Sequence, residues 1–182
     1  MLAKIGLGAL ALIAILLVVI ATRPAAFRIE RSATIAAPAE VVFAQIQDLH
    51  RWERWNPFEK DASMRKTFEG APAGVGSAYH YVSDHSGEGR MTLTDLQPNR
   101  RVGVRAEFIR PMAATNEVEF TLRPGPRGVT VTWAMSGRNP FLGKAISLFV
   151  NMDRMVGGQF EQGLADLKRL SEAEARTAVA AL

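Results

Sequence analysis

Apolar and polar residues alternate through most of the chain between residues 27 and 136, a pattern typical of strands that bury one face. It predicts seven strands: Phe27–Ile35, Met64–Phe68, Ser77–Ser83, Gly89–Leu96, Arg101–Phe108, Thr115–Leu122 and Val129–Ser136. Short turns containing glycine, proline, serine or asparagine separate most of the later strands, so we expect neighbouring strands to pair antiparallel. The inner face of this sheet then carries Tyr79, Tyr81, Met91, Leu93, Val102, Val104, Ala106, Phe108, Val118, Phe120, Leu122, Val129, Val131, Trp133 and Met135.

Two regions show helical spacing of apolar residues instead. Pro38 stands in the first turn of a segment that follows the first strand, and Pro57 ends the next segment because proline disfavours helix at the residue before it. We therefore expect two short helices there. Near the end of the chain, Phe149–Leu170 repeats apolar residues at intervals of three and four, which predicts a long amphipathic helix lying on the sheet.

The composition of this last helix leaves two interpretations open. Gly157, Gly158 and Gly163 each weaken a helix interior by roughly 1 kcal/mol relative to alanine, which indicates close approach to the sheet or space beneath the helix. Met152 and Met155 are flexible and fill irregular volumes. The helix is either an ordinary core helix with loose packing or the roof of a cavity.

An unbroken run of apolar residues and glycine covers Ile5–Ala21. At 1.5 Å per residue, this run and Thr22 would span about 27 Å, close to a hydrocarbon thickness of about 30 Å. We therefore predict a single-pass membrane anchor at residues 1–23, with a secretory signal peptide as the alternative. The side of the domain stays open, because the flanking charges favour the cytoplasm and the short, basic start favours the periplasm. The expected organisation continues with a linker at residues 24–26, a domain at residues 27–171 and a frayed tail at residues 172–182.

Composition narrows the function. Of the 182 residues, 48% are hydrophobic and none is cysteine, which excludes disulfides, thiol catalysis and cysteine-ligated metal. The net charge of +4 comes mainly from arginine, and acidic residues are interspersed with the basic ones, so we expect no nucleic-acid partner. We also expect a monomer. His50, His80 and His85 lack metal-ligand spacing, and no nucleophile elbow, phosphate loop or dinucleotide motif occurs. We therefore assign no catalytic residue, metal or cofactor.

The order of elements, a strand, two short helices, six strands and a long final helix, resembles the helix-grip fold. Within it, several segments are similar to the SRPBCC superfamily (START-related and Bet v 1-like proteins), and specifically to its bacterial polyketide cyclase/dehydrase and lipid-transport group. They are residues 31–43, the Trp52 and Trp55 region, and residues 74–77, 87–91, 129–133 and 160–168. The resemblance implies an α+β fold in which a curved antiparallel seven-stranded sheet grips the terminal helix. It does not specify the activity, because that superfamily includes carriers, cyclases, hydroxylase domains and regulatory modules.

We expect a cavity between the sheet and the last helix, because inward alternation on the strands meets a helical stripe that carries methionines and glycines. Trp133, on the last strand, should face Phe160, on the helix. The candidate ligand-binding residues are Trp52, Trp55, Tyr79, Tyr81, Met91, Trp133, Met152, Met155 and Phe160. The favoured hypothesis is a membrane-anchored carrier or sensor of a hydrophobic small molecule or lipid. The alternatives are a cyclase- or dehydratase-like enzyme using the same cavity, and a non-binding interaction module with a solid core.

Individual residues keep alternatives of their own. Trp52 and Trp55 form either an aromatic plug over the sheet edge or a rim of the cavity mouth. The tyrosine hydroxyls bond either backbone carbonyls or ligand oxygens. Alternation points His80 away from the inner face. Among the acidic residues that might act as acid or base, Asp48, Asp84, Glu88 and Asp95 stand out, although most such residues belong to the solvated face.

Overall fold

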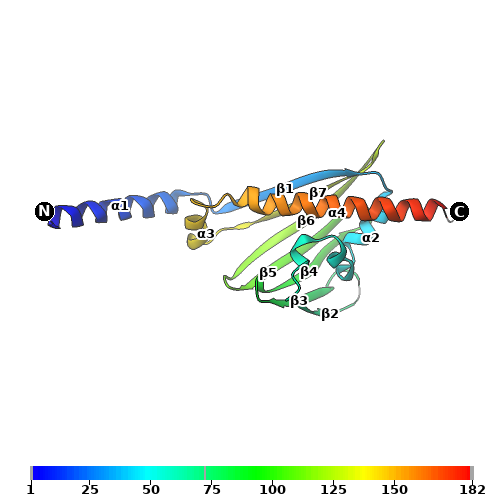
Figure 1. Ribbon diagram of the computed structural model, residues 1–182, viewed down its shortest axis with the longest axis horizontal. Coiled ribbons are helices and arrows are strands. Elements are labelled where there is room, and N and C mark those ends of the chain that lie inside the picture. Colours follow the sequence, from blue (N-terminus) through cyan, green and yellow to red (C-terminus); the bar gives the residue numbers. More distant parts are fainter. Residues whose placement is uncertain (1, 72, 181–182) are drawn as a thin grey trace.

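A computed structural model describes residues 2–71 and 73–180, with backbone alone at residues 2–5, 7, 9, 11 and 179. Seven strands form one antiparallel sheet in the order β1-β7-β6-β5-β4-β3-β2, which curves beneath a long helix (Figure 1). The strands are β1 (Ala26–Ile35), β2 (Arg65–Glu69), β3 (Ala78–Ser83), β4 (Gly87–Gln97), β5 (Arg101–Arg110), β6 (Ala114–Gly125) and β7 (Gly128–Arg138). The helices are α1 (Leu2–Thr22), α2 (Ala39–Ile46), the 3-10 helices η1 (Leu49–Arg54) and η2 (Pro57–Glu59), α3 (Phe141–Ile146) and α4 (Met152–Ala180).

The expected α+β architecture of sheet and closing helix is confirmed. Each predicted strand overlaps one observed strand, and their ends agree within three residues. The inner-face assignment also holds, because its members are buried except Met91, Phe108 and Met135, which are partly buried against the core. Helical segments lie in both regions where short helices were expected. The first is α2, and the second consists of the two 3-10 helices η1 and η2.

The closing helix differs from its prediction at both ends. It begins at Met152 because the Asn151 side chain accepts a hydrogen bond from the Arg154 backbone N–H at 3.0 Å, which caps the first turn. Phe149 precedes the helix and is 85% exposed. The tail that we expected to fray is helical as far as Ala180. Ser171 is buried, Glu172 accepts a hydrogen bond from the Ala36 backbone N–H, and Glu174 accepts one from the Gln45 side chain in α2. Residues 181–182 lie outside the described part.

The amino-terminal segment forms the helix α1, which projects from the end of the domain where α3 lies (Figure 1). Within the described residues, no helix combines the length and the apolar character needed to cross a membrane. The predicted single-pass anchor is therefore not supported. The side chains of residues 5, 7, 9 and 11 lie outside the description.

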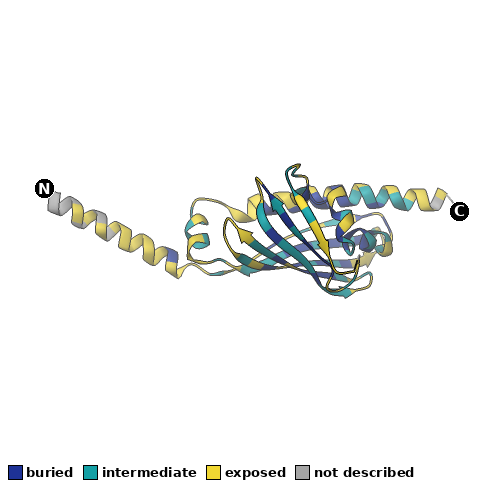
Figure 2. Ribbon diagram, turned by 90° about the horizontal axis from the view of Figure 1, so that it is seen from below, coloured by how far each residue is buried: buried dark blue, intermediate teal, exposed yellow. Residues whose placement is uncertain are grey.

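Trp133 and Phe160 stack face to face, as predicted, with ring centroids 4.3 Å apart and planes 11° from parallel. Gly163, one turn further along α4, permits this closeness. A Cβ atom at Gly163 would lie 2.6 Å from the Trp133 ring and 2.9 Å from Pro57 Cδ. The buried face of α4 therefore rests on the sheet at this point, while its outer face is exposed (Figure 2).

Two glycine-to-alanine substitutions in α4 should change stability in opposite directions. A Cβ atom at Gly158 would meet no other atom within 4 Å, so Gly158→Ala should stabilise the domain by about 1 kcal/mol through helix propensity. Gly163→Ala gains the same propensity but forces apart a packed ring, which typically costs about 1–3 kcal/mol. Urea unfolding of both variants measures the difference. Equal stabilisation by both would contradict the close contact.

Candidate functional site

A cavity of about 660 Å³ lies between the inner face of the sheet and the first half of α4. Seven of the nine predicted ligand-binding residues line it: Trp52, Tyr79, Tyr81, Met91, Trp133, Met152 and Phe160. The other two do not. Whether any of these residues binds a ligand stays a prediction, but the geometry brings them together from β3, β4, β7, η1 and α4.

The two exceptions have physical reasons. Trp55 is fully buried in the core, where its ring packs against Phe120 and Trp133, and its indole N–H donates to the Gln45 carbonyl at 3.2 Å. Trp52 likewise donates to the Ile46 carbonyl at 2.8 Å, but its ring also borders the cavity. Met155 is 54% exposed because its neighbour Val156 takes the position on α4 that faces the cavity.

Methionine is the most frequent large residue of the wall. Of the seven methionines in the chain, Met64, Met91, Met112, Met135 and Met152 line the cavity. Their thioether side chains are unbranched and polarisable, so they adapt to differently shaped apolar surfaces. Such a wall favours an apolar occupant without requiring one fixed shape.

One end of the cavity holds a polar group that the sequence analysis missed. Glu59 in η2 lines the cavity with a side chain that is only 1% exposed. One carboxylate oxygen accepts a hydrogen bond from the Tyr79 hydroxyl at 2.7 Å, and the other accepts one from Lys66 Nζ at 2.7 Å. Burial raises the pKa of Glu59, and the bonds from Lys66 and Tyr79 oppose that rise. Burial and the adjacent carboxylate also raise the pKa of Tyr79.

Strand periodicity did not reveal Glu59 because it lies in an irregular turn. Asn56 fixes that turn by accepting the Phe58 backbone N–H on its side chain at 3.1 Å, and Pro57 begins the 3-10 helix. A usable signal was Lys66, which pairs in register with Tyr81 and so belongs to the inner face. An inward lysine requires an acidic partner.

The second inner tyrosine differs from the first. Among the described residues, no hydrogen-bond partner accompanies the hydroxyl of Tyr81, which lines the cavity, and burial raises its pKa. Asn116 supplies another buried polar side chain, whose amide lies 3.8 Å from the sulfur of Met135. The wall is therefore apolar with a few separated polar points, as in many small-molecule sites.

The cavity opens towards the end of the domain that carries α3. Exposed residues of its lining gather there, including Arg28, Arg138 and Pro140. Arg31 fastens the start of α4 over this side through bonds to Asp153 at 3.0 and 3.1 Å and to Glu161 at 2.7 Å. These bonds lower the pKa of Asp153 and raise that of Arg31.

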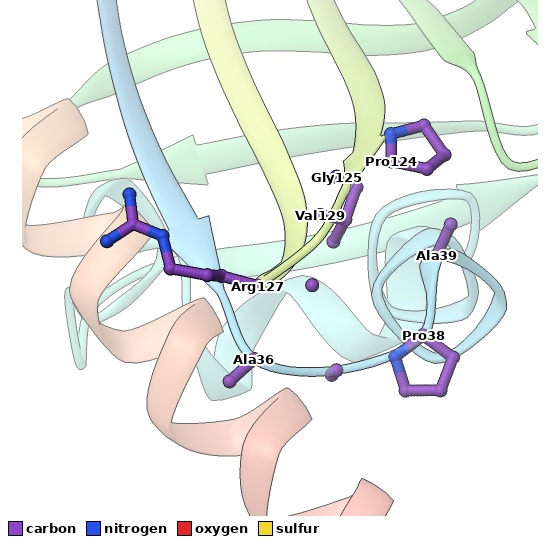
Figure 3. Close-up of a pocket in the computed structure, with 9 residues that line it drawn as sticks. Ala36, Pro38, Ala39, Pro124, Gly125, Arg127 and Val129 are labelled. Carbon is purple, nitrogen blue, oxygen red and sulfur yellow. The ribbon is translucent and has the colours of Figure 1, made fainter.

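A second hollow, of about 460 Å³, lies on the surface at the opposite end, between the chain after β1 and the β6–β7 turn (Figure 3). Small apolar residues such as Ala36 and Ala39 line it, and the guanidinium of Arg127 points away from them. It offers no buried polar side chain to fix a ligand. The described residues also hold no group of three or more His, Asp or Glu side chains placed to bind a metal ion. The interior cavity is therefore the candidate site.

Comparison with protein families identifies the domain. The family model described as "Polyketide cyclase / dehydrase and lipid transport" matches residues 26–172. The chain belongs to this family. The match confirms the resemblance inferred from the sequence and covers every strand of the sheet.

Several solved structures have the same fold as this family member. The di-domain ARO/CYC StfQ from the steffimycin biosynthetic pathway matches with a TM-score of 0.63 and 12% identity, over 83% of this chain and 52% of that chain. A protein from Chromobacterium violaceum matches at 0.58 and 18%, over 80% and 96%. An Aha1 dimer from Colwellia psychrerythraea matches at 0.58 and 17%, over 80% and 96%. At these identities the likeness shows the fold alone. The comparison with curated proteins found no match.

Removing the Tyr79 hydroxyl should destabilise the domain in a pH-dependent way. Tyr79→Phe deletes a hydrogen bond to a carboxylate, which typically contributes about 1.5–3 kcal/mol. The pKa of Glu59 is raised in the folded state. Protonation of Glu59 therefore adds to the free energy of unfolding; this contribution is complete below about pH 4.5 and is lost as the pH rises through the folded pKa. Because the hydroxyl stabilises the ionised form, the Tyr79→Phe penalty should be larger at pH 8 than at pH 5.

Urea unfolding of wild type and variant at both pH values measures this penalty. Tyr81→Phe is the matched control, because it removes a hydroxyl from the same strand face without breaking a protein hydrogen bond in the described chain. Equal penalties at both pH values, or equal penalties for both tyrosines, would contradict the assigned Tyr79–Glu59 bond.

Proposed function

We propose that this protein binds a hydrophobic small molecule or lipid in its interior cavity and acts as a carrier or sensor of that ligand. The observation that carries the proposal is the 660 Å³ cavity itself, which lies within the size range of small-molecule sites. Its wall combines aromatic rings, methionines and a few polar points. The family description, which includes lipid transport, supports the same interpretation.

The polar points indicate how a ligand would be oriented. Glu59 already accepts bonds from Tyr79 and Lys66, so an ionised Glu59 would repel an anionic group placed beside it. The hydroxyl of Tyr81 is better placed than Glu59 to bond a ligand oxygen, because it lines the cavity without a protein hydrogen-bond partner in the described chain. The ligand is therefore a mainly apolar molecule with few oxygens, and any carboxylate or phosphate group that it carries is directed to the cavity opening near α3.

A second candidate function, acid–base catalysis of the cyclase or dehydratase type, is favoured by Glu59. A buried carboxyl with a raised pKa inside a cavity is a common arrangement for proton transfer. The similarity to a structure described as an ARO/CYC from a biosynthetic pathway supports this alternative through the fold alone. The third hypothesis, a solid interaction module, is disfavoured by the size of the cavity. An anchor that crosses the membrane does not form part of the proposal.

Filling the cavity should weaken ligand uptake. Ala106 lies on the inner face of β5, opposite Met91 and Asn116, and lines the cavity. Ala106→Phe should place its ring in the empty volume and weaken binding of a fluorescent polyene fatty acid at least tenfold, with little change in melting temperature. A substitution at Met155 would not fill the cavity, because Met155 lies outside it.

Thr115→Phe is the matched control, because Thr115 is an exposed residue on the outer face of β6, next to Asn116. It should bind the probe as the wild type does. If Ala106→Phe fails to fold, Ala106→Leu replaces it. Unchanged uptake by a folded cavity-filling variant would overturn the binding proposal.

Native mass spectrometry of the Glu59→Gln variant separates the two candidate functions, carriage and acid–base catalysis. A carrier retains the same co-purified ligand as the wild type, whereas an enzyme accumulates a different one.

A further inference from the structure

The end of the domain near α3 exposes an unusual number of large apolar side chains. We call this set the mouth surface; its members are Phe141, Leu142, Ile146, Phe149, Val150, Met152 and Met155. Phe149 is 85% exposed and Leu142 is 60% exposed. Large apolar side chains grouped in this way on a protein surface mark a site of interaction. No described element covers them.

The mouth surface lies beside α1 and beside the cavity opening. Lys144 of α3 donates to the Ala21 carbonyl at 3.3 Å, and the Asn139 backbone N–H donates to the Ala25 carbonyl at 2.8 Å. Pro140, Gly143 and Met152 line the cavity at this end. Figures 1 and 2 show α1, whose described side chains are mostly exposed, leaving the domain from the same end.

The charges around the mouth surface are mainly positive. Arg23, Arg138, Lys144 and Arg154 have no carboxylate partner among the ion pairs of the described residues, although Lys144 binds a carbonyl. The acidic group in the first turn of α4, Asp153, is already paired with Arg31. Exposed apolar side chains surrounded by basic residues are suited to an anionic bilayer surface. The apolar side chains can insert between the headgroups, and the anionic headgroups attract lysine and arginine.

We propose that the mouth surface docks onto an anionic phospholipid bilayer, with Leu142 and Phe149 inserted at the boundary between headgroups and acyl chains. A second copy of the chain is a poorer occupant, since it would bring the same basic residues together. Docking requires no helix to cross the bilayer, and it does not depend on the proposed ligand. If the cavity binds a lipid, a consequence resting on the proposed function, its opening then faces the membrane from which that lipid would enter.

Tryptophan placed at the mouth surface tests the docking directly. Full-length Phe149→Trp is mixed with phosphatidylcholine vesicles containing one quarter phosphatidylglycerol, with or without brominated phosphatidylcholine, and the wild-type signal of the three native tryptophans is subtracted. Docking predicts a blue-shifted emission that brominated lipid quenches, and weaker quenching when phosphatidylglycerol is omitted or salt is raised to about 0.5 M. Val75→Trp is the matched control, because Val75 is a highly exposed apolar residue in the β2–β3 loop and should not be quenched.

The readout reports contact by residue 149 itself, so binding of vesicles through α1 alone does not imitate it. Vesicle-bound protein without quenching at position 149 would overturn the proposal. A blue shift that grows with protein concentration in the absence of vesicles would also overturn it, in favour of a second copy as occupant. Loss of probe binding in the cavity-filling variant leaves these outcomes unchanged, so the two proposals fail separately.

Discussion

The contact between Trp133 and Phe160 determines how the closing helix lies on the sheet. The rings stack 4.3 Å apart because Gly163 leaves no side chain between α4 and the indole. Beyond this contact, Leu164 and Leu167 are buried, and the second half of the helix packs against α2. Before it, Met152, Val156 and Phe160 cover the cavity. One helix therefore seals the core with its second half and covers the cavity with its first.

The polar end of the cavity is costly for folding, which makes its presence informative. Transferring a carboxylate from water to an apolar interior costs several kcal/mol unless other groups bond to it, and Glu59 receives bonds from both Lys66 and Tyr79. Apolar residues of similar volume would fill the same place without that cost. Stability therefore does not explain a buried ion pair beside an otherwise apolar cavity, and this supports the proposed role of Glu59 at the site.

Alternation along the strands was sufficient to predict the sheet and most of the site, because a period of two fixes which face each residue occupies once one face is buried. Tyr79, Tyr81, Met91 and Trp133 were placed in this way. The remaining features depend on local bonds that leave little periodic signal. Examples are the turn that carries Glu59 and the Asn151 cap, which starts α4 three residues later than its apolar spacing suggested.

The methionines provide the most direct measurement of the central claim, that the cavity holds an apolar ligand. Their methyl groups can be labelled with ¹³C, and they sample both the wall and the outer surface: Met91 and Met135 lie inside, whereas Met155 lies outside. Titration with a long-chain fatty alcohol should shift the resonances of Met91 and Met135 and give intermolecular contacts to both, while leaving Met155 unchanged. Shifts confined to Met155, with none at Met91 or Met135, would show that apolar molecules bind only at the surface and would contradict the account.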